Sequence, residues 1–400
     1  MIKKEQPITV VHIITRLILG GAQENTILTV EGLQKRPEYK VILISGPALG
    51  PEGELVKRVR DSGVELIIIP ELRRNINPFL EVVAFTKLLL LMRRLKPDIV
   101  HTHSAKAGIL GRWAAYLSGV KIIVHTLHGL SFYPYQNKLV NFLYIVAEKA
   151  AAFVTTKFIS VADAMTDQSL KAGIGAPEKY TTIYSALELD KFAPKETDQE
   201  VKRRLGLANN KVVGTIARLF PLKGHEYILR MAVRIIRQVP EVKFLFVGDG
   251  SLSEQIKREV NGRGLDDWFV FTGLVPPAQI PSMIQAIDIL VHPSLREGLA
   301  RTIPQSFALG KPVVSFDVDG ARELVINSQT GFLIPAPASE SKTRESLGQM
   351  AEAIIFLLKN PEQARQMGQA GRKLIIPNFD ANYMVGKIIE QYVVLTNPQK

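Results

Sequence analysis

The feature that most constrains the fold of this chain is a regular alternation of short apolar runs with segments of helical spacing. Runs rich in Val, Ile and Leu are typical of strands buried on both faces of a parallel sheet. The first half of the chain contains six: ITVVHIIT, KVILIS, VELIIIP, DIVHTH, KIIVHTLH and KFISV. This alternation predicts a doubly wound α/β sheet.

The same alternation restarts after a polar stretch, DKFAPKETDQEVKRRLG, with an expected boundary near 187–200. The later runs are VVGTIARL, KFLFVGDG, WFVFTG, DILVHPS, KPVVSFDV and GFLIP. We therefore expect two Rossmann-like doubly wound domains in series, 1–186 and 187–377. Ligands of such sheets bind beyond the carboxyl ends of the strands, so the cleft between the two domains is the expected site.

Length and composition fit a soluble or peripheral protein with large cores. The 400 residues are 46% hydrophobic and 22% charged, which is ordinary for a globular chain of about two domains. The absence of cysteine excludes a disulfide framework, a thiolate metal site and a cysteine nucleophile, and favours a cytoplasmic location. The longest apolar helical segment, VVAFTKLLLLMRRLK, is amphipathic and too short to span a bilayer.

The net charge of +12 is concentrated in the first half of the chain, where residues 1–186 carry an excess of eight positive charges. Such an excess suits phosphate groups, an anionic membrane or nucleic acid. Its charges come as scattered pairs such as Arg73-Arg74, without any zinc, RNP-like or helix-turn-helix signature. Solvated surface charge is therefore the first interpretation, docking on an anionic membrane the second and nucleic acid the third.

Two turns of the first half are candidate ligand sites. Gly20 and Gly21 follow the first predicted strand in RLILGGAQENT, where bare backbone lets an anion approach the start of the next helix. As an alternative, many turns of this kind need glycine only because the backbone there has a positive φ. His128 and Gly129 follow the fifth predicted strand, but a single histidine at a strand end is more often structural than catalytic.

Other histidines of the first half give no metal signal. His101, His103 and His125 lie in or just after predicted strands, and no two histidines and a carboxylate have the spacing of a metal site. The sequence therefore predicts no metal ion. His101 and His125 are expected inside their strands, as core or lining groups with satisfied polar atoms.

Candidate phosphate-binding residues follow strands of the second half. Arg218 and Lys223, one loop apart and before a predicted helix, suit a clamp for a diphosphate leaving group, although two surface charges explain them equally well. FLFVGDG closes the next strand with glycines that include Gly248. Because the chain contains neither GxGxxG nor GxxxxGK[ST], the dehydrogenase and P-loop interpretations lose their main support.

These motifs together resemble one family. Six motifs carry the resemblance: Gly20-Gly21, His128-Gly129, RLFPLKG, FVGDG, FTGLV and HPSLREGLARTIPQSFALGKPVV. Their order and spacing, from about residue 8 to residue 336, are similar to those of the retaining glycosyltransferases of family 4. The resemblance implies the GT-B fold, in which two Rossmann-like domains face each other across a cleft. It also implies that a C-terminal helix, 378–400, joins the first domain.

The resemblance implies a function for each domain. Domain 1–186 would bind the acceptor, a glycan or lipid-linked molecule, and domain 187–377 the donor, a UDP- or GDP-sugar, with no other cofactor. Transfer would serve bacterial cell-envelope polysaccharide, lipopolysaccharide or glycolipid synthesis, in the cytoplasm or at the inner face of the plasma membrane. No nucleic-acid partner is implied.

The resemblance also implies roles for individual residues. Glu297 would bind hydroxyls of the donor sugar and His128 the same sugar, while Arg218 and Lys223 would neutralise the diphosphate in place of a metal. Gln305 would contact the ribose. Backbone amides near sugar and phosphate would come from Gly298, Leu299, Ala300, Arg301 and Thr302, and acceptor or phosphate contacts from Gly20, Gly21 and His103.

The chain departs from the family pattern at three places. Gln305 replaces the second Glu, Leu299-Ala300 replaces Phe-Gly, and YSALELDKF (184–192) replaces an Asn-Gly-Val-Asp turn. A Gln keeps an acceptor oxygen for a ribose hydroxyl, so binding should weaken without vanishing. As purely structural alternatives, Glu297 would be an N-terminal helix cap and Gln305 an ordinary helical residue.

Three rival functions follow from the same sequence. A nucleotide-sugar 2-epimerase of the same fold would bind the donor but need acid and base groups for another step. A non-catalytic nucleotide-sugar-binding protein, left after loss of the second Glu, would bind without turnover. A nucleic-acid binder would show salt-sensitive association with DNA or RNA. The sequence names neither the sugar, the base, the acceptor nor the linkage.

Overall fold

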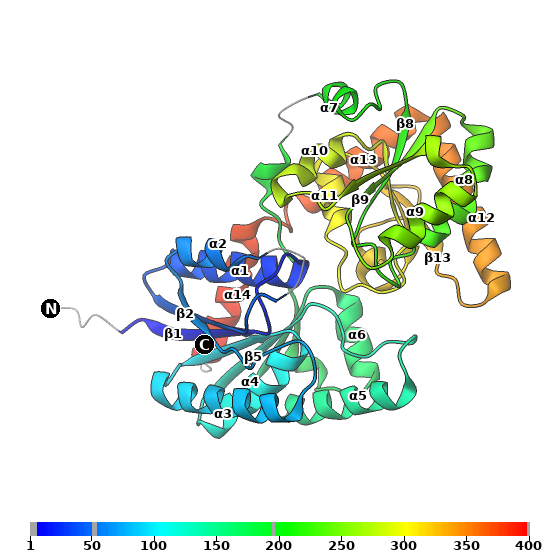
Figure 1. Ribbon diagram of the computed structural model, residues 1–400. Helices are drawn as coiled ribbons and strands as arrows, with labels where there is room; N and C mark the ends of the chain where they lie inside the picture. Colours follow the sequence, from blue (N-terminus) through cyan, green and yellow to red (C-terminus); the bar gives the residue numbers. More distant parts are fainter. Residues whose placement is uncertain (1–5, 50–53, 194–196, 398–400) are drawn as a thin grey trace. The chain divides into compact units, whose positions relative to one another are not determined.

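The computed structural model describes residues 6–49, 54–193 and 197–397. The chain divides into two compact units, Met1–Ala186 with Ala381–Lys400, and Leu187–Asp380 (Figure 1). Where the chain enters and leaves the second unit, the Leu187 amide donates a hydrogen bond of 2.8 Å to the Phe379 carbonyl. Residues 194–196 of the polar stretch between the two halves lie outside the described ranges.

The first unit is built on a parallel sheet of seven strands in the order β3-β2-β1-β4-β5-β6-β7. Six of these strands match the apolar runs of the sequence. The three-residue β7 is too short to give a recognisable run. The bounds are β1 (Ile8–Ile14), β2 (Tyr39–Ser45), β3 (Glu65–Ile68), β4 (Ile99–His103), β5 (Ile122–Leu127), β6 (Lys157–Ser160) and β7 (Tyr180–Thr182).

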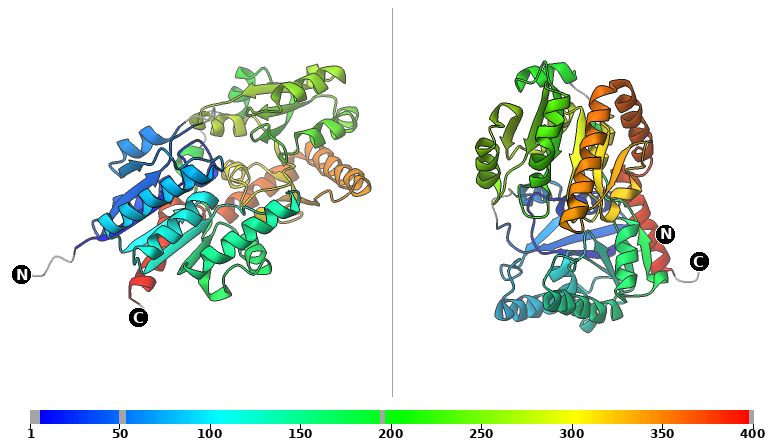
Figure 2. Two further views of the ribbon diagram at one scale, coloured as in Figure 1. Left: turned by 60° about the horizontal axis from the view of Figure 1, so that its bottom comes forward. Right: turned by 90° about the vertical axis from the view of Figure 1, so that its right-hand side faces the viewer.

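Helices cover both faces of this first sheet, as the alternation along β1 requires. Val10 and Ile14 share a core with α1 and α14, whereas Val11 and Ile13 share one with α3 and α4. Figure 2 shows α3, α4 and α5 side by side on their face. The bounds are α1 (Gly21–Gln34), α2 (Val56–Asp61), α3 (Pro78–Leu95), α4 (Ala105–Leu117), α5 (Lys138–Phe153), α6 (Asp163–Lys171) and α14 (Ala381–Thr396).

The second unit is built on a parallel sheet of six strands in the order β10-β9-β8-β11-β12-β13. Its strands are β8 (Lys211–Ile216), β9 (Val242–Val247), β10 (Phe269–Gly273), β11 (Ile289–His292), β12 (Val313–Asp317) and β13 (Gly331–Pro335). Its helices are α7 (Asp198–Arg204), α8 (His225–Gln238), α9 (Ser253–Gly262), α10 (Ile280–Gln285), α11 (Thr302–Ala308), α12 (Glu340–Lys359) and α13 (Pro361–Ile375). Short 3₁₀ turns lie at Pro177–Lys179, Leu189–Phe192, Asp266–Trp268, Pro277–Gln279 and Asp319–Glu323.

Both sheets confirm the predicted doubly wound α/β class. The strand order reverses between β1 and β4 in the first sheet and between β8 and β11 in the second. The crevice beyond the carboxyl ends at such a reversal is where ligands of this fold class bind. Within the described ranges, no helix combines the length and the hydropathy that a membrane span needs.

Candidate functional site

Two loops meet at the strand-order reversal of the second sheet, one after β8 and one after β11. The Leu222 carbonyl of the first loop accepts hydrogen bonds from the Ser294 hydroxyl (3.1 Å) and the Leu295 amide (2.8 Å) of the second. These bonds join the loop that carries Lys223 to the loop that carries Glu297.

The backbone of the first loop is strained around Lys223. Leu222 has a φ of 68°, in the left-handed region that residues with a Cβ rarely adopt. Gly224 has a φ of 76°, and a Cβ there would lie 2.0 Å from the Pro293 carbonyl oxygen. A glycine is therefore required at 224, and this turn sets the position from which Lys223 reaches Glu297.

Lys223 and Glu297 form an ion pair in which Nζ and Oε1 are 2.5 Å apart. Only about a fifth of each side chain is exposed (21% and 20%). The Glu297 amide donates a hydrogen bond of 2.7 Å to Asp319 Oδ2, which holds the second loop. Burial raises the pKa of Glu297. Lys223, His292 and hydrogen bonds together lower this pKa by more than burial raises it, so it lies below its ordinary value.

His292, at the end of β11, lies beside this pair. Its Nε2 is 3.6 Å from Glu297 Oε1 and has no hydrogen-bond partner among the residues that the structure describes. Burial is the main cause that lowers the pKa of His292 to about 4, so the ring is neutral. The sequence motifs did not single out His292, because its buried, unpartnered nitrogen is a feature of the tertiary structure. Such a nitrogen often marks a functional position or an ion site.

The other predicted residues of the second unit lie around the same loops. Arg218 stacks on the Phe220 ring, with its Cζ 5.0 Å from the ring centre. Gly248 has a φ of 137°, and a Cβ there would lie 2.2 Å from the Ala217 carbonyl oxygen, so FVGDG brings the loop after β9 against the loop after β8. Gln305 is half-buried in α11.

The loop between Glu297 and α11 is largely buried. Leu299 and Ala300 are 7% and 5% exposed, and the Gly298 carbonyl accepts a hydrogen bond of 3.1 Å from the Gly320 amide. Helix α11 begins at Thr302 and has Arg301 at its N-cap position. The alternative that Glu297 caps this helix is therefore wrong, because its carboxylate pairs with Lys223 instead.

In the first unit, Gly20 and Gly21 lie at the start of α1. Gly20 has a φ of 170°, which is extended backbone, so the alternative that this glycine serves a positive φ does not apply. Ser104, in the HTHSAKAG turn (101–108) that the sequence also makes a candidate for acceptor binding, has a φ of 63° and shares a 2.7 Å hydrogen bond with the Thr15 hydroxyl. This bond joins the carboxyl ends of β1 and β4 at the strand-order reversal.

The histidines of the first unit lie deeper than the sequence indicated. His128 is half-buried, and its Nε2 is 3.0 Å from His103 Nδ1. His103 is 1% exposed and reaches His12 through its other nitrogen, so it lies behind His128 and not at the surface. His101 and His125 have buried hydrogen-bond partners, as expected of core groups.

Three buried histidines form a group that could hold a metal ion. Single nitrogens of His12, His101 and His103 lie within 4.8 Å of one another. These three histidines have no metal-site spacing in the sequence, because His12 is on β1 and the other two are on β4. The His101 and His103 rings are stacked at 4.4 Å, with 26° between their planes, and nitrogens of these side chains hydrogen bond to protein groups. This arrangement favours a hydrogen-bonded cluster over a metal centre.

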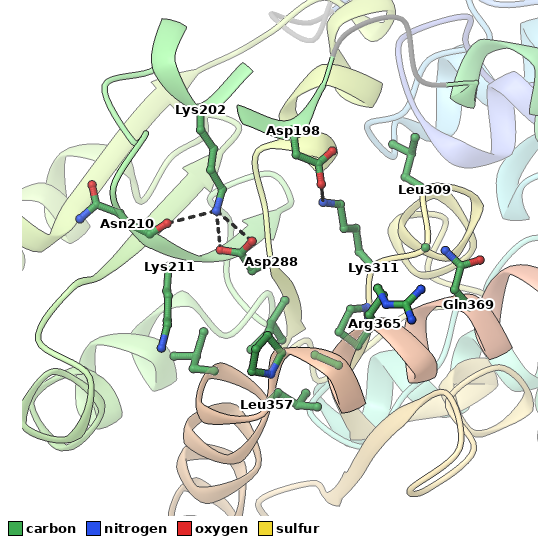
Figure 3. Close-up of a pocket in the computed structure, with 16 residues that line it drawn as sticks. Asp198, Lys202, Asn210, Lys211, Asp288, Leu309, Lys311, Leu357, Arg365 and Gln369 are labelled. Atoms are coloured by element: carbon green, nitrogen blue, oxygen red, sulfur yellow. Dashed lines mark hydrogen bonds and ion pairs between the residues drawn. The ribbon is translucent and has the colours of Figure 1, made fainter. Parts of the chain in front are cut away.

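A separate hollow of about 450 Å³ lies at the opposite edge of the second sheet, at the amino ends of β8, β11 and β12 (Figure 3). Its cationic side chains are engaged by carboxylates. Lys202 Nζ is 2.6 Å from Asp288, and Lys311 Nζ is 2.5 Å from Asp198. We assign this hollow no role in donor binding, because it is remote from the carboxyl ends of the strands.

Comparison with known proteins places both units in one family. The family model described as Glycosyltransferase Family 4 matches residues 19–191, and the one described as Glycosyl transferases group 1 matches 197–374. The UDP-Gal:alpha-D-GlcNAc-diphosphoundecaprenol alpha-1,3-galactosyltransferase of Escherichia coli is 33% identical over 96% of this chain and 97% of its own length. The capsular polysaccharide biosynthesis glycosyltransferase CapM of Staphylococcus aureus is 24% identical over 84% and 87%.

Solved structures agree on the fold. The crystal structure of Anabaena HepE in complex with UDP-glucose has a TM-score of 0.80 and 22% identity, and the match covers 96% of this chain and 99% of that one. The predicted GT-B fold, family and enzyme class are thereby confirmed. The chain belongs to glycosyltransferase family 4 and is a glycosyltransferase of the GT-B fold.

Proposed function

We propose that this enzyme transfers a sugar, with retention of anomeric configuration, from a UDP-sugar to a hydroxyl of a lipid-diphosphate-linked acceptor in bacterial envelope glycan synthesis. The observation that carries this proposal is the Lys223–Glu297 pair at the strand-order reversal of the second sheet. The printed activity of the Escherichia coli relative, with its UDP-Gal donor and undecaprenol-linked acceptor, supports the choice of substrates.

The donor would separate the ion pair. Lys223, with Arg218, would turn to the diphosphate and stabilise the charge that develops as it leaves. Glu297 would then accept hydrogen bonds from sugar hydroxyls. His292 Nε2, 3.6 Å from Glu297 Oε1, would take the place of Lys223 as a partner of the carboxylate.

The transfer step needs no covalent intermediate with the protein. The bond between sugar C1 and the diphosphate oxygen breaks, and its electron pair leaves with UDP. The acceptor oxygen forms its bond to C1 on the same face, and its proton passes to an oxygen of the departing diphosphate. The protein contributes positioning and charge stabilisation.

The remaining predicted residues keep their proposed roles, except His103, whose side chain is 1% exposed and is not proposed to contact the acceptor. Gln305 would contact the ribose, and Gly248 would let the backbone approach the nucleotide. In the first unit, His128 would hydrogen bond to the donor sugar, and Gly20 and Gly21 would lie near the acceptor phosphate. The amides of Gly298, Leu299, Ala300, Arg301 and Thr302 would serve sugar and phosphate.

A surface of the first unit suits a membrane-bound acceptor. The α3–α5 apolar surface consists of large side chains that are at least 45% exposed: Phe79, Val82 and Leu90 of α3, and Leu139, Phe142, Leu143, Val146 and Phe153 of α5. Single exposed apolar residues are normal on a soluble protein, but eight of them on two helices that both pack against α4 are typical of an interaction site. With the basic excess of residues 1–186, we propose peripheral association with an anionic membrane.

A turnover assay tests the function. The enzyme would be incubated with UDP-sugars, or with GDP-sugars as controls, and with a short-chain polyprenyl-diphosphate N-acetylglucosamine, in buffer with and without EDTA. We expect one UDP-sugar to give a transfer product whose new bond has the donor's anomeric configuration, with or without EDTA. Binding without product, an epimerised donor, an inverted linkage or strict metal dependence would contradict the proposal.

A further inference from the structure

A line of hydrogen-bonded side chains runs through the first unit from α14 to His128. His128 Nε2 lies 3.0 Å from His103 Nδ1, and His103 Nε2 lies 3.0 Å from His12 Nδ1. His12 Nε2 is 3.5 Å from the Tyr392 hydroxyl, which is 2.6 Å from His101 Nδ1. The line ends at Thr126, whose hydroxyl is 2.6 Å from His101 Nε2.

The sheet and α14 place these groups together. His12 and His101 are register partners on neighbouring strands, and His103 is two residues beyond His101 on the same face. Tyr392 reaches them from α14, and all four side chains are at most 1% exposed. Burial is the main cause that lowers the pKa of His12 to about 3 and the pKa values of His101 and His103 well below 6.5. Each of these rings is therefore neutral, with one N–H and one lone pair.

The Tyr392 phenol gives the line a direction. His101 Nδ1 lies 2.6 Å from the Tyr392 hydroxyl and His101 Nε2 lies 2.6 Å from the Thr126 hydroxyl, and a neutral ring accepts from one and donates to the other. Because a phenol is a stronger donor than an aliphatic hydroxyl, Tyr392 donates to His101 Nδ1 and His101 Nε2 donates to Thr126. His12 Nε2, which faces the same oxygen, must then carry its proton, and His12 Nδ1 is left as an acceptor. It follows that His103 Nε2 donates to His12 and that His103 Nδ1 accepts from His128 Nε2.

We propose that this line positions His128: it orients the ring and holds it in the Nε2–H tautomer. The inference rests on the proposed contact of His128 with the sugar, and it deepens that contact by naming the residues that set the orientation and tautomer of the ring. His103, His12 and Tyr392 are positioning residues, because they act through His128. Similar partners behind the ligating histidines of metal sites fix tautomer and ring orientation.

Spectroscopy tests the tautomer directly. In protein labelled with ¹⁵N in its histidine rings, long-range proton–nitrogen correlations at pH 7.5 distinguish protonated nitrogens from those with a lone pair. We expect the His128 signals, assigned with His128→Ala, to show protonated Nε2 and unprotonated Nδ1. Tyr392→Phe, which removes only the hydroxyl at the far end, should give a mixture of tautomers. A protonated Nδ1 in the wild type, or an unchanged tautomer in Tyr392→Phe, would overturn the proposal.

Kinetics test whether the positioning matters. His103→Leu breaks the line, whereas His103→Gln keeps it, since the amide can donate to His12 and accept from His128. We expect His103→Leu to lower kcat/KM for the UDP-sugar about tenfold, as for loss of a group that orients another, and His103→Gln to recover most of it. In a His128→Ala background the same His103→Leu change should have no further effect, because coupled residues are not additive.

The outcomes separate this inference from the proposed function. If His128→Ala alone has wild-type kcat/KM, the proposed role of His128 is wrong. If His128→Ala is impaired but His103→Leu is harmless, or lowers kcat/KM equally in both backgrounds, the positioning line is wrong. A stoichiometric transition metal in the purified protein, lost in His12→Gln, would also overturn it by making the cluster a metal centre.

Discussion

At the scale of single residues, the candidate site depends on how side chains from separate loops meet. Lys223 and Glu297 are 74 residues apart in sequence and form an ion pair of 2.5 Å. The sequence indicated that each was a candidate, from its place after a strand, but their pairing follows from a turn that needs glycine at 224. The first two predictions concern residues of this site.

Lys223→Ala should lower turnover at least about 100-fold, the usual effect of losing one preorganised electrostatic group at developing charge. The variant should remain folded, since the pair is partly exposed. Without the ammonium, the pKa of Glu297 should rise, because burial then acts with less opposition. Steady-state kinetics would measure the effect, with Lys257→Ala on exposed α9 as the control. Near-normal turnover of a folded Lys223→Ala would leave Lys223 a structural charge.

Gln305→Ala should weaken UDP binding by about 1–3 kcal/mol if the amide contacts the ribose, because a buried hydroxyl then lacks a partner. Gln305→Glu should be tolerated, since it restores the acceptor common in the family. Calorimetry with UDP would compare both with Glu297→Gln, which should affect turnover of the donor more than affinity for UDP. Wild-type affinity and turnover of Gln305→Ala would make Gln305 an ordinary helical residue.

At the scale of elements, helices α4 and α5 of the first unit are joined by a buried ion pair. Arg112 on α4 is fully buried, and its Nη2 is 2.6 Å from Glu148 Oε2 on α5. The guanidinium also donates to the Gly108 carbonyl at 2.9 Å and to the Thr155 hydroxyl at 3.3 Å. These contacts hold α5, which carries much of the α3–α5 apolar surface, onto α4.

Removing one partner of such a pair leaves a buried charge without compensation. Arg112→Met should therefore destabilise the first unit by about 3–5 kcal/mol. Arg112→Met with Glu148→Leu should recover part of the loss. Urea unfolding followed by Trp113 fluorescence in a Trp268→Phe background would report the first unit alone, because each unit contains one tryptophan. A single variant as stable as the wild type would show that the pair contributes little.

The α3–α5 apolar surface makes a prediction about membranes. Phe142→Glu places a charge where a side chain is 60% exposed, and it should reduce flotation with anionic vesicles at low salt without affecting the fold. Raised salt should also weaken binding, because the basic residues are screened. Val233→Glu, at an exposed apolar position of the second unit, is the control. Equal flotation with neutral and anionic vesicles would contradict the charge-dependent docking.

At the scale of the whole molecule, acid stability should differ between the two units. All seven histidines lie in the described ranges, and six are buried: four in the first unit and two, His225 and His292, in the second. Burial is the largest cause that lowers the pKa in each of the six, to about 4 for His225 and His292. These imidazoles are therefore neutral in the folded protein near neutral pH.

Below about pH 6.5, which is the pKa of a histidine in the unfolded chain, the unfolded chain binds protons that the native protein does not. The contribution of the buried neutral histidines to the free energy of unfolding should thus be fully present above this pH. It should decrease as the pH falls from 6.5 towards 4, by up to about 1.4 kcal/mol per pH unit for each histidine. The first unit should lose stability about twice as steeply as the second. Urea unfolding of Trp113-only and Trp268-only variants between pH 7 and 5 checks this. If the free energy of unfolding depended equally on pH in both units, or did not depend on pH, the prediction would be wrong.

The sequence by itself determined the fold class and the candidate residues of the second unit. Buried parallel strands read as continuous apolar runs, and binding residues follow strand ends, so both signals are local in the chain. The three-residue β7 was too short to give such a signal. The domain roles, the retaining mechanism and the residue roles stay predictions.

Only the tertiary structure decided which polar groups meet. The orphaned Nε2 of His292 depends on which groups pack around it. The Lys223–Glu297 pair and the line from Tyr392 to His128 join residues from distant parts of the chain. Their proximity depends on strand register, on a strained turn, and on the return of α14 to the first unit. No spacing in the sequence encodes such a meeting, because the register between strands is set by packing of the whole sheet.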